Sequence, residues 1–173
     1  MKSNIITERL ELNLLDFKDR LFILELLNTP GWLKYIGDRN VKTADEAKAY
    51  IQKIRDNSNF NYWTVTLKES DTAIGIITFL KRDYLEHYDI GFAFLPHWMK
   101  NGYAYEATNA VLDEIAHDPG YRKVLAITIK ENESSIKLLE RLGLSFEKEI
   151  VQDSMPLLMY SRDVYIKASE FIF

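Results

Sequence analysis

The sequence predicts an α/β domain built on a mixed β-sheet, and three observations support this prediction. Strand-like runs follow one another along the chain, which favours antiparallel pairing between neighbours. Residues 87–129 read as strand, helix, strand, which favours one parallel pair, because such a crossover returns to the same sheet. The chain has 173 residues and shows no repeat or linker, so we expect residues 1–173 to form a single domain.

The N-terminal third of the chain predicts one strand followed by helices. Partial alternation of leucines favours the strand, and polar residues ahead of apolar runs at helical spacing favour the helix starts. Thr43 and Glu46 have the spacing of a capping box, in which each side chain bonds the backbone of the other. In order, we expect a strand at residues 5–14, a helix capped by Asp16 and ended by Pro30-Gly31, a short helix or turn at residues 32–37, and a helix from Thr43 through Ile54.

The rest of the chain predicts most of the sheet. β-Branched and aromatic runs bounded by turn residues favour strands, and apolar residues at helical spacing favour two helices. The expected strands are residues 61–67, 73–80, 87–95 and 124–129, with a closing hairpin formed by 144–151 and 157–166 around 152–156; the expected helices are residues 102–117 and 134–142.

Composition excludes several classes of function. The net charge of −4 argues against a broad basic face for nucleic acid, although a local anion site remains open. There is no cysteine, which excludes disulfides, thiolate metal sites and a cysteine nucleophile. The three histidines lack metal-ligand spacing, so we expect no metal. No signal peptide or membrane-length apolar run is present, so we expect a cytoplasmic protein without a membrane partner.

The strongest chemical signal lies where the strand at residues 87–95 leads into the helix at 102–117. The first amides of a helix have no internal acceptor and carry partial positive charge. Gly102 lets a ligand approach the backbone, and Ala104 keeps the next turn thin. Such a loop can bind a diphosphate through backbone N–H groups without a basic patch. An ordinary strand-to-helix loop with glycine at a tight turn explains the same residues.

Three blocks together resemble the GNAT acetyltransferases, and within them the ribosomal-protein-alanine N-acetyltransferase branch. The first is Thr7-Glu8-Arg9-Leu10, similar to the opening strand of that branch. The second, residues 89–107, resembles the family's strand and acetyl-CoA loop. The third begins at Asn132 and Ser135 and continues to Gly143-Leu144, similar to the family's asparagine-bearing helix and the strand after it. The resemblance spans residues 7–160.

The resemblance implies a GNAT-like fold: a mostly antiparallel sheet with one splayed parallel pair, ending near Leu95 and Ile129, and about four flanking helices. It implies acetyl-CoA as cosubstrate, with its pantetheine arm in the gap between the splayed strands. The implied contacts are the backbone of Phe94, Leu95 and Pro96 along the arm, the amides of Lys100, Asn101, Gly102, Tyr103 and Ala104 on the diphosphate, Asn132 on the arm, and Ser135 near the sulfur or the arm.

Two positions depart from the family pattern. Met99 stands where the loop usually carries glutamine or arginine, so its side chain cannot supply that polar contact, and Lys100 is a candidate to compensate. Leu139 stands where many members carry a tyrosine general acid. A thiolate is a good leaving group, so the reaction tolerates this loss, with Ser135 or water assisting.

The implied reaction is direct acetyl transfer to a primary amine, on a small molecule or a peptide. An alkyl ammonium must lose a proton to attack, which a carboxylate base can accept. Asp89 is the first candidate, because it shares a strand face with small Gly91 and Ala93, and Glu86 is the second. Aromatic residues Trp32, Tyr35, Trp63 and Tyr84, and the segments 30–43 and 149–156, are candidates for the acceptor site.

Two alternatives stay open. A degenerate acyl-CoA sensor would hold CoA without turnover, and a scaffold would bind no nucleotide at all. Met99 and Leu139 favour the sensor, since both replace polar groups that the family uses. The protein is expected to be a monomer or a homodimer.

Overall fold

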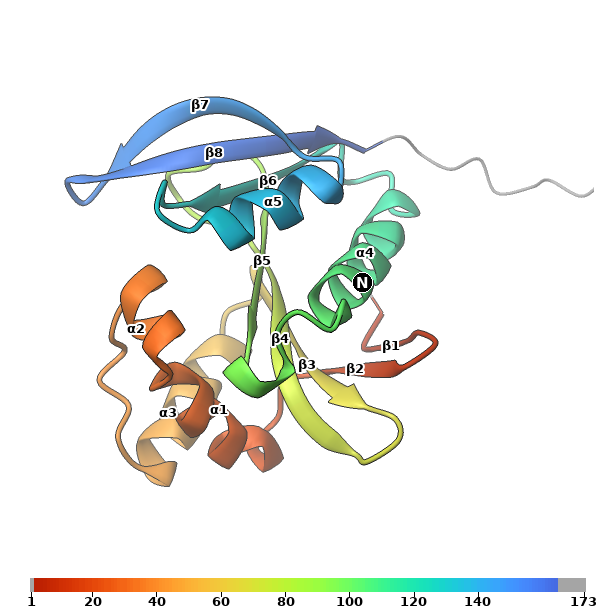
Figure 1. Cartoon of the computed structure of the whole chain (residues 1–173), viewed down its shortest axis with the longest axis vertical. Coiled ribbons are helices and arrows are strands. Elements are labelled where there is room, and N and C mark those ends of the chain that lie inside the picture. The colour runs from red at the N-terminus through yellow and green to blue at the C-terminus, as the bar shows by residue number, and fades with distance from the viewer. Residues whose placement is uncertain (1, 165–173) are drawn as a thin grey trace, which may run out of the picture.

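The structure is a computed structural model that describes residues 2–164, and its centre is a single mixed sheet (Figure 1). The strand order is β1-β2-β3-β4-β5-β6-β8-β7, and every neighbouring pair is antiparallel except β5 and β6. The predicted mixed sheet with one parallel pair is therefore confirmed. The strands are β1 (Asn4–Ile6), β2 (Leu10–Leu14), β3 (Phe60–Leu67), β4 (Thr72–Leu80), β5 (Asp89–Phe94), β6 (Lys123–Thr128), β7 (Ser145–Gln152) and β8 (Met155–Asp163).

Helices cover both faces of this sheet (Figure 1). One apolar core packs α1, α2 and α3 against one face, and a second core packs α4 and α5 against the other. The α-helices are α1 (Arg20–Leu27), α2 (Pro30–Tyr35), α3 (Ala44–Arg55), α4 (Tyr103–Ala116) and α5 (Glu133–Arg141); short 3-10 turns occupy η1 (Phe17–Asp19) and η2 (Pro96–Trp98).

The strand predicted for residues 5–14 is wrong as a single element. It divides into β1 and β2, which pair antiparallel around a turn at residues 7–9. Thr7 closes this turn, because its amide donates to the Leu10 carbonyl at 2.9 Å and its Oγ1 accepts from the Leu10 amide at 3.0 Å. The turn residues carry polar side chains with partners elsewhere in the fold, which a partial alternation of leucines does not reveal.

The prediction that Pro30-Gly31 ends the first helix is also wrong. The first helix ends at Leu27, and Pro30 is the first residue of α2, where its missing N–H costs no hydrogen bond. Thr29 caps this helix by accepting from the Trp32 amide at 3.4 Å. The described residues thus form five α-helices instead of about four.

The capping box at the start of α3 is confirmed. The Glu46 amide donates to Thr43 Oγ1 at 3.2 Å, and the Thr43 amide donates to Glu46 Oε2 at 3.0 Å. These two bonds satisfy backbone groups that a helix start leaves without internal partners.

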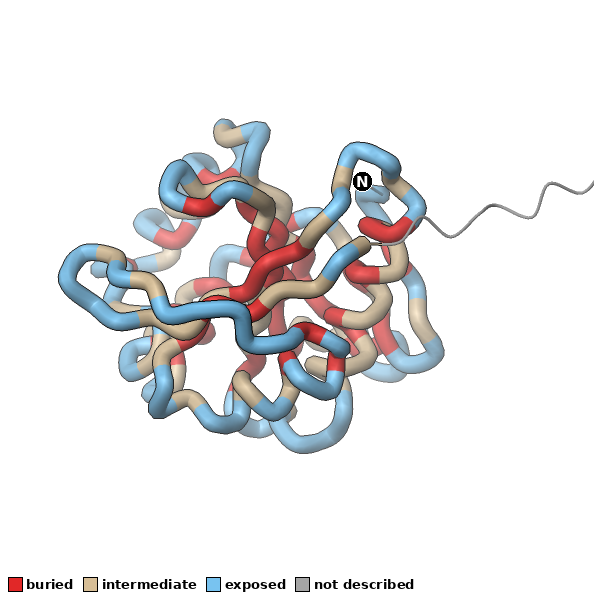
Figure 2. The backbone as a smooth tube through the Cα atoms, turned by 90° about the horizontal axis from the view of Figure 1, so that it is seen from above, coloured by how far each residue is buried: buried red, intermediate tan, exposed pale blue. Residues whose placement is uncertain are grey.

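The closing hairpin is present but its turn is shorter than expected. Gln152 and Met155 are still paired, so only Asp153 and Ser154 form the turn, with φ of 48° and 64°. Both values match a two-residue hairpin turn that follows the twist of the strands. β7 is the edge strand and is exposed along most of its length (Figure 2). The end of the predicted run 157–166 lies partly outside the described residues.

Gly75 offers a test of how tightly β4 and β5 pack. A Cβ at Gly75 would lie 2.4 Å from the Phe94 ring, so alanine there forces the ring or the strand to move. We expect Gly75→Ala to lower the free energy of unfolding by about 1–3 kcal/mol. Gly31→Ala is the matched control, because a Cβ there meets no atom within 4 Å. Urea unfolding of both variants measures the difference, and equal stabilities would contradict the packing described.

Candidate functional site

β5 and β6 form a wedge that is closed at one end and open at the other. Their parallel pairing consists of one residue pair, Asp89 with Leu125, and the Leu125 amide donates to the Tyr88 carbonyl at 2.9 Å. Beyond this pair, within residues 2–164, β5 pairs only with β4 and β6 pairs only with β8. The sequence-predicted splay therefore lies between the C-terminal halves of these strands (Figure 1).

The open side of the wedge exposes main-chain hydrogen-bonding groups of β5. The Leu95 amide donates to the Ile74 carbonyl on the β4 side at 2.9 Å. Successive residues of a strand direct their N–H and C=O groups to opposite edges. The backbone groups of Phe92 and Phe94 therefore point into the gap, where an extended chain can pair with them as an added strand.

The loop between β5 and α4 carries free amides at the mouth of the wedge. Lys100 and Gly102 both have left-handed backbone, with φ of 65° and 82°, and Gly102 is the N-cap of α4. Within residues 2–164, none of the backbone amides of residues 100–104 donates a hydrogen bond to a backbone carbonyl. Because the first turn of a helix carries partial positive charge, these N–H groups can bind an anion.

An ion pair that the sequence reasoning missed lies against this loop. Arg9 Nη2 is 2.7 Å from Glu106 Oε2, and Arg9 Nη1 donates to the Asn101 carbonyl at 3.1 Å. Partial burial opposes ionisation, but hydrogen bonds from Thr7 and Arg9 outweigh it and lower the pKa of Glu106. Both residues lie in the blocks that carry the family resemblance, but no local pattern pairs two residues 97 positions apart.

Asn132 and Ser135 lie at the start of α5, across the wedge from β5. The Asn132 Oδ1 caps the helix by accepting from the Ser135 amide at 3.3 Å. The Nδ2 group of Asn132 keeps its two donors for another acceptor, because the cap uses only the oxygen. Leu139 is 1% exposed and packs in the core under α4 and α5.

Asp89 lies at the closed end of the wedge and is 2% exposed. Arg82 Nε donates to Oδ1 of Asp89 at 2.8 Å, and Oδ2 takes no part in this hydrogen bond. Burial raises the pKa of Asp89, and the nearby Arg82 guanidinium offsets only part of that rise. The structure thus provides a buried carboxyl group whose pKa is shifted toward neutrality, as a general base at neutral pH requires.

The space that Gly91 leaves beside β5 is filled by another side chain of the protein. A Cβ on Gly91 would lie 2.7 Å from Thr78 Oγ1, so the Thr78 hydroxyl already uses the space that glycine provides. Ala93 packs with the core beneath α1–α3, and alternation along β5 places Asp89 on that same face.

Tyrosines surround the Asp89–Arg82 pair. Burial, with Tyr50 as a hydrogen-bond partner, raises the pKa of Tyr62 far above the ordinary phenol value. Burial also raises the pKa of the Tyr84 phenol, while Arg82 lowers it. Both phenols therefore stay protonated at neutral pH and act as hydrogen-bond donors or acceptors.

The other expected residues are placed as follows. The Glu86 side chain is 89% exposed, and its nearest ionic partner is His87 at 4.0 Å. Trp63, expected near the acceptor, is buried in the α4-side core, and its Nε1 donates to the Lys2 carbonyl at 3.2 Å. Trp32 packs in the other core, and its buried Nε1 has no hydrogen-bond partner among the described residues.

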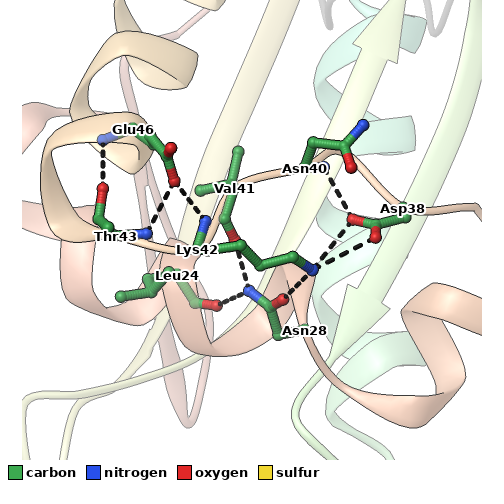
Figure 3. A network of polar contacts seen from close by, with 8 residues as sticks. All are labelled: Leu24, Asn28, Asp38, Asn40, Val41, Lys42, Thr43 and Glu46. Atoms are coloured by element: carbon green, nitrogen blue, oxygen red, sulfur yellow. Dashed lines mark hydrogen bonds and ion pairs between the residues drawn. The ribbon is translucent and has the colours of Figure 1, made fainter.

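The connection between α2 and α3 is held by a polar network (Figure 3). Lys42 Nζ donates to Asn28 Oδ1 at 2.9 Å and to Asp38 Oδ1 at 3.2 Å. The Asn28 Nδ2 group donates to the Leu24 and Val41 carbonyls, each at 2.8 Å. These bonds fix the loop that the resemblance assigns to acceptor recognition.

Comparison with known proteins decides the family. The model of the acetyltransferase (GNAT) domain matches residues 9–145, which is well over half of the chain. The chain belongs to the GNAT acetyltransferase family. The uncharacterized N-acetyltransferase YnaD of Bacillus subtilis strain 168 is 31% identical to this GNAT chain over 144 residues, covering 83% of it and 84% of YnaD.

Solved structures of other acetyltransferases share the fold. The ribosomal-protein-S5-alanine acetyltransferase from Vibrio fischeri aligns with a TM-score of 0.79 and 17% identity, covering 94% of this GNAT chain and 97% of that one. The spermidine N-acetyltransferase from Vibrio cholerae, solved with CoA and spermine, aligns with a TM-score of 0.78 and 18% identity, covering 91% and 97%. The ribosomal-protein branch is thus one neighbour among several.

Neither a metal-binding cluster nor a membrane-spanning helix is present among residues 2–164. Residues 2–164 hold no group of three or more histidine or acidic side chains arranged to bind a metal ion. None of the helices in that range has both the length and the apolar character of a membrane span.

Replacing Arg82 should change how stability depends on pH. Arg82→Met removes the cation that lowers the pKa of Asp89, so that pKa rises further. The native state then keeps a proton that the unfolded state has lost. The free energy of unfolding therefore falls as the pH rises from the ordinary carboxyl range through the raised pKa of Asp89, and the fall extends to higher pH than in the wild type.

Urea unfolding between pH 4 and pH 8 measures this dependence. The double variant Arg82→Met/Asp89→Asn is the control, since it lacks the titrating carboxyl group. The same pH dependence in Arg82→Met and the wild type would show that the two side chains are not coupled.

Proposed function

We propose that this GNAT protein transfers the acetyl group of acetyl-CoA directly to a primary amine. The single observation that carries the proposal is the wedge between β5 and β6, which opens beside a loop of free amides. The pantetheine arm is an extended chain with amide groups and fits the exposed backbone edge of Phe92 and Phe94. The diphosphate fits the amides of residues 100–104 at the N-terminus of α4.

Of the remaining predicted cofactor contacts, Asn132 fits this placement, because it retains its Nδ2 donors. The backbone of Leu95 and Pro96 does not fit. The Leu95 amide donates to the Ile74 carbonyl, and the Leu95 and Pro96 carbonyls accept from the Trp98 and Met99 amides. Met99 is an exposed residue whose side chain offers no hydrogen bond to an anion. The backbone amides therefore supply the diphosphate contacts, with Lys100 adding positive charge nearby.

Asp89 is the proposed general base. The amine nitrogen attacks the thioester carbonyl carbon, and its proton passes to the Asp89 carboxylate directly or through water. The C–S bond then breaks, and the CoA thiolate takes a proton from water, either directly or relayed through the Ser135 hydroxyl, which regains its proton from water. The chain has no cysteine, so no acyl-cysteine intermediate forms and both substrates bind together. Glu86 is the weaker candidate, because its exposed carboxylate lacks the burial that raises the pKa of Asp89.

The proposed acceptor is a primary amine on a peptide N-terminus or on a small molecule such as a polyamine. The neighbours named above act, by their names, on a ribosomal-protein alanine and on spermidine. An acyl-CoA sensor would need no base, whereas this chain buries a carboxyl group at the closed end of the wedge. Thiol release from acetyl-CoA over a panel of an N-terminal peptide, spermidine and free amino acids separates enzyme from sensor. Tight CoA binding with no thiol released would favour the sensor.

Gly102→Trp tests the diphosphate site. The indole would cover the approach to the amides of residues 100–104, so we expect CoA affinity to fall at least about 100-fold. Gly143→Trp is the matched control, because Gly143 has the same φ of 82° and carries the same backbone strain away from this loop. Calorimetric titration with CoA measures both variants, and unchanged affinity in Gly102→Trp would refute the loop assignment.

Asp89→Asn tests the base. We expect the wild-type rate to rise with pH as Asp89 loses its proton, because burial raises the pKa of Asp89 above the ordinary carboxyl value. We expect the variant to lose this limb and about 10²-fold or more in kcat/KM. CoA affinity should stay within about twofold, because Asp89 lies at the opposite end of β5 from the loop. A pH–rate profile identical in shape to the wild type would exclude Asp89.

A further inference from the structure

The carboxylate of Glu106 joins the turn between β1 and β2 to the first turns of α4. Its Oε2 accepts from Arg9 Nε and from Arg9 Nη2, each at 2.7 Å. Its Oε1 accepts from Thr7 Oγ1 at 2.6 Å and from the Arg9 amide at 3.0 Å. Four donors on one carboxylate fix both the side chain of Glu106 and the guanidinium of Arg9.

The same guanidinium contacts Asn101 and Tyr103 of the loop and lies close to Gly102 between them. Arg9 Nη1 donates to the Asn101 carbonyl at 3.1 Å. Arg9 Nη2 lies 3.4 Å from the position of a Cβ on Gly102, and the guanidinium carbon lies 4.4 Å from the centre of the Tyr103 ring. Arg9 therefore touches the loop at the residues whose amides are proposed to bind the diphosphate.

The hydrogen bond from Arg9 to the Asn101 carbonyl also fixes the orientation of the next amide, that of Gly102. In a planar trans peptide, the C=O of one residue and the N–H of the next point in opposite directions. Because the Asn101 carbonyl points toward Arg9, the Gly102 N–H points away from Arg9. The left-handed backbone of Lys100 is unfavourable for a residue with a side chain, so the loop needs support from outside itself.

We propose that Arg9 and Glu106 are positioning residues that hold the amides of residues 100–104 in the geometry that binds the CoA diphosphate. This inference rests on the proposed function, because it takes that loop as the diphosphate site. The Arg9 side chain is 42% exposed and that of Glu106 only 19%, so the pair also contributes to folding stability. CoA affinity of the folded protein is therefore the readout that reports positioning.

A second ion pair provides the control. Lys2 Nζ lies 2.8 Å from Glu114 Oε1, and this pair likewise joins the N-terminal segment to α4. Glu114 lies near the end of α4, far from the loop at its start. Variants of this pair disturb the docking of α4 without touching the residues that hold the loop.

The test compares Arg9→Ala, Glu106→Gln and the double variant with Lys2→Ala and Glu114→Gln. We expect each of the first two to raise the Kd for CoA and the KM for acetyl-CoA about tenfold, with kcat and the acceptor KM within about twofold. The double variant should lose no more CoA affinity than Arg9→Ala, because either single change already breaks the same ion pair. The two control variants should bind CoA within about twofold of the wild type.

The direction in which Glu106→Gln changes CoA affinity distinguishes a positioning role of Arg9 from simple charge attraction. If Arg9 acted only as a positive charge near the phosphates, removing the negative charge of Glu106 would strengthen CoA binding; the proposal requires weaker binding. Stronger or unchanged binding in Glu106→Gln overturns the proposal, as does an equal loss in the Lys2 and Glu114 variants. If Arg9→Ala binds CoA normally while Gly102→Trp does not, the proposed function stands and only the positioning role fails. If neither variant loses affinity, the loop assignment itself fails.

Discussion

The pairing of β5 with β6 at one position is the constraint on which the site depends. A strand buried inside a sheet normally has partners on both edges, and an unpaired backbone edge is unfavourable away from water. Here β4 and β8 hold the outer edges of the two strands, so the inner edges separate without the sheet falling apart. The separation exposes a row of hydrogen-bonding groups whose natural complement is another extended chain.

The elements around the wedge each place one group where the proposed reaction uses it. α4 starts at the open end and directs unbonded amides there, while α5 starts across the gap with the amide group of Asn132. Asp89 stands at the closed end, next to the single strand pair. The arrangement separates the anion-binding end from the proton-accepting end along the length of one strand. A strand rises about 3.3 Å per residue, so Asp89 and Phe94 lie roughly 17 Å apart.

Much of this fold could be predicted from local patterns, and the exceptions have physical causes. The capping box of Thr43 and the parallel pair of β5 and β6 followed from spacing and element order. The turn at Thr7 did not, because its polar side chain bonds to a helix nearly a hundred residues away. Pro30 was predicted to end a helix but begins one, because proline is compatible with either position. The cap at Thr29 shows that it is the first residue of α2.

The candidate site shows the same division. Gly102 and the helix start after it carry a local signal for anion binding. The ion-pair partner of Asp89 has no such local signal, because Arg82 comes next to Asp89 only when β4 and β5 pair. Arg9 lies in the first of the three blocks that resemble the family, but its contact with the loop depends on a turn that local patterns did not predict. Long-range pairs of charged residues are thus the part of a site that periodicity cannot reveal.

Titration of ¹⁵N-labelled protein with CoA, followed by backbone amide NMR, tests the central claim most directly. The largest shifts are expected at the amides of residues 100–104, with a second group at Phe92 and Phe94, whose N–H groups face the gap. Shifts confined to other parts of the sheet, or no shifts at millimolar CoA, would contradict the placement of the cosubstrate between β5 and β6.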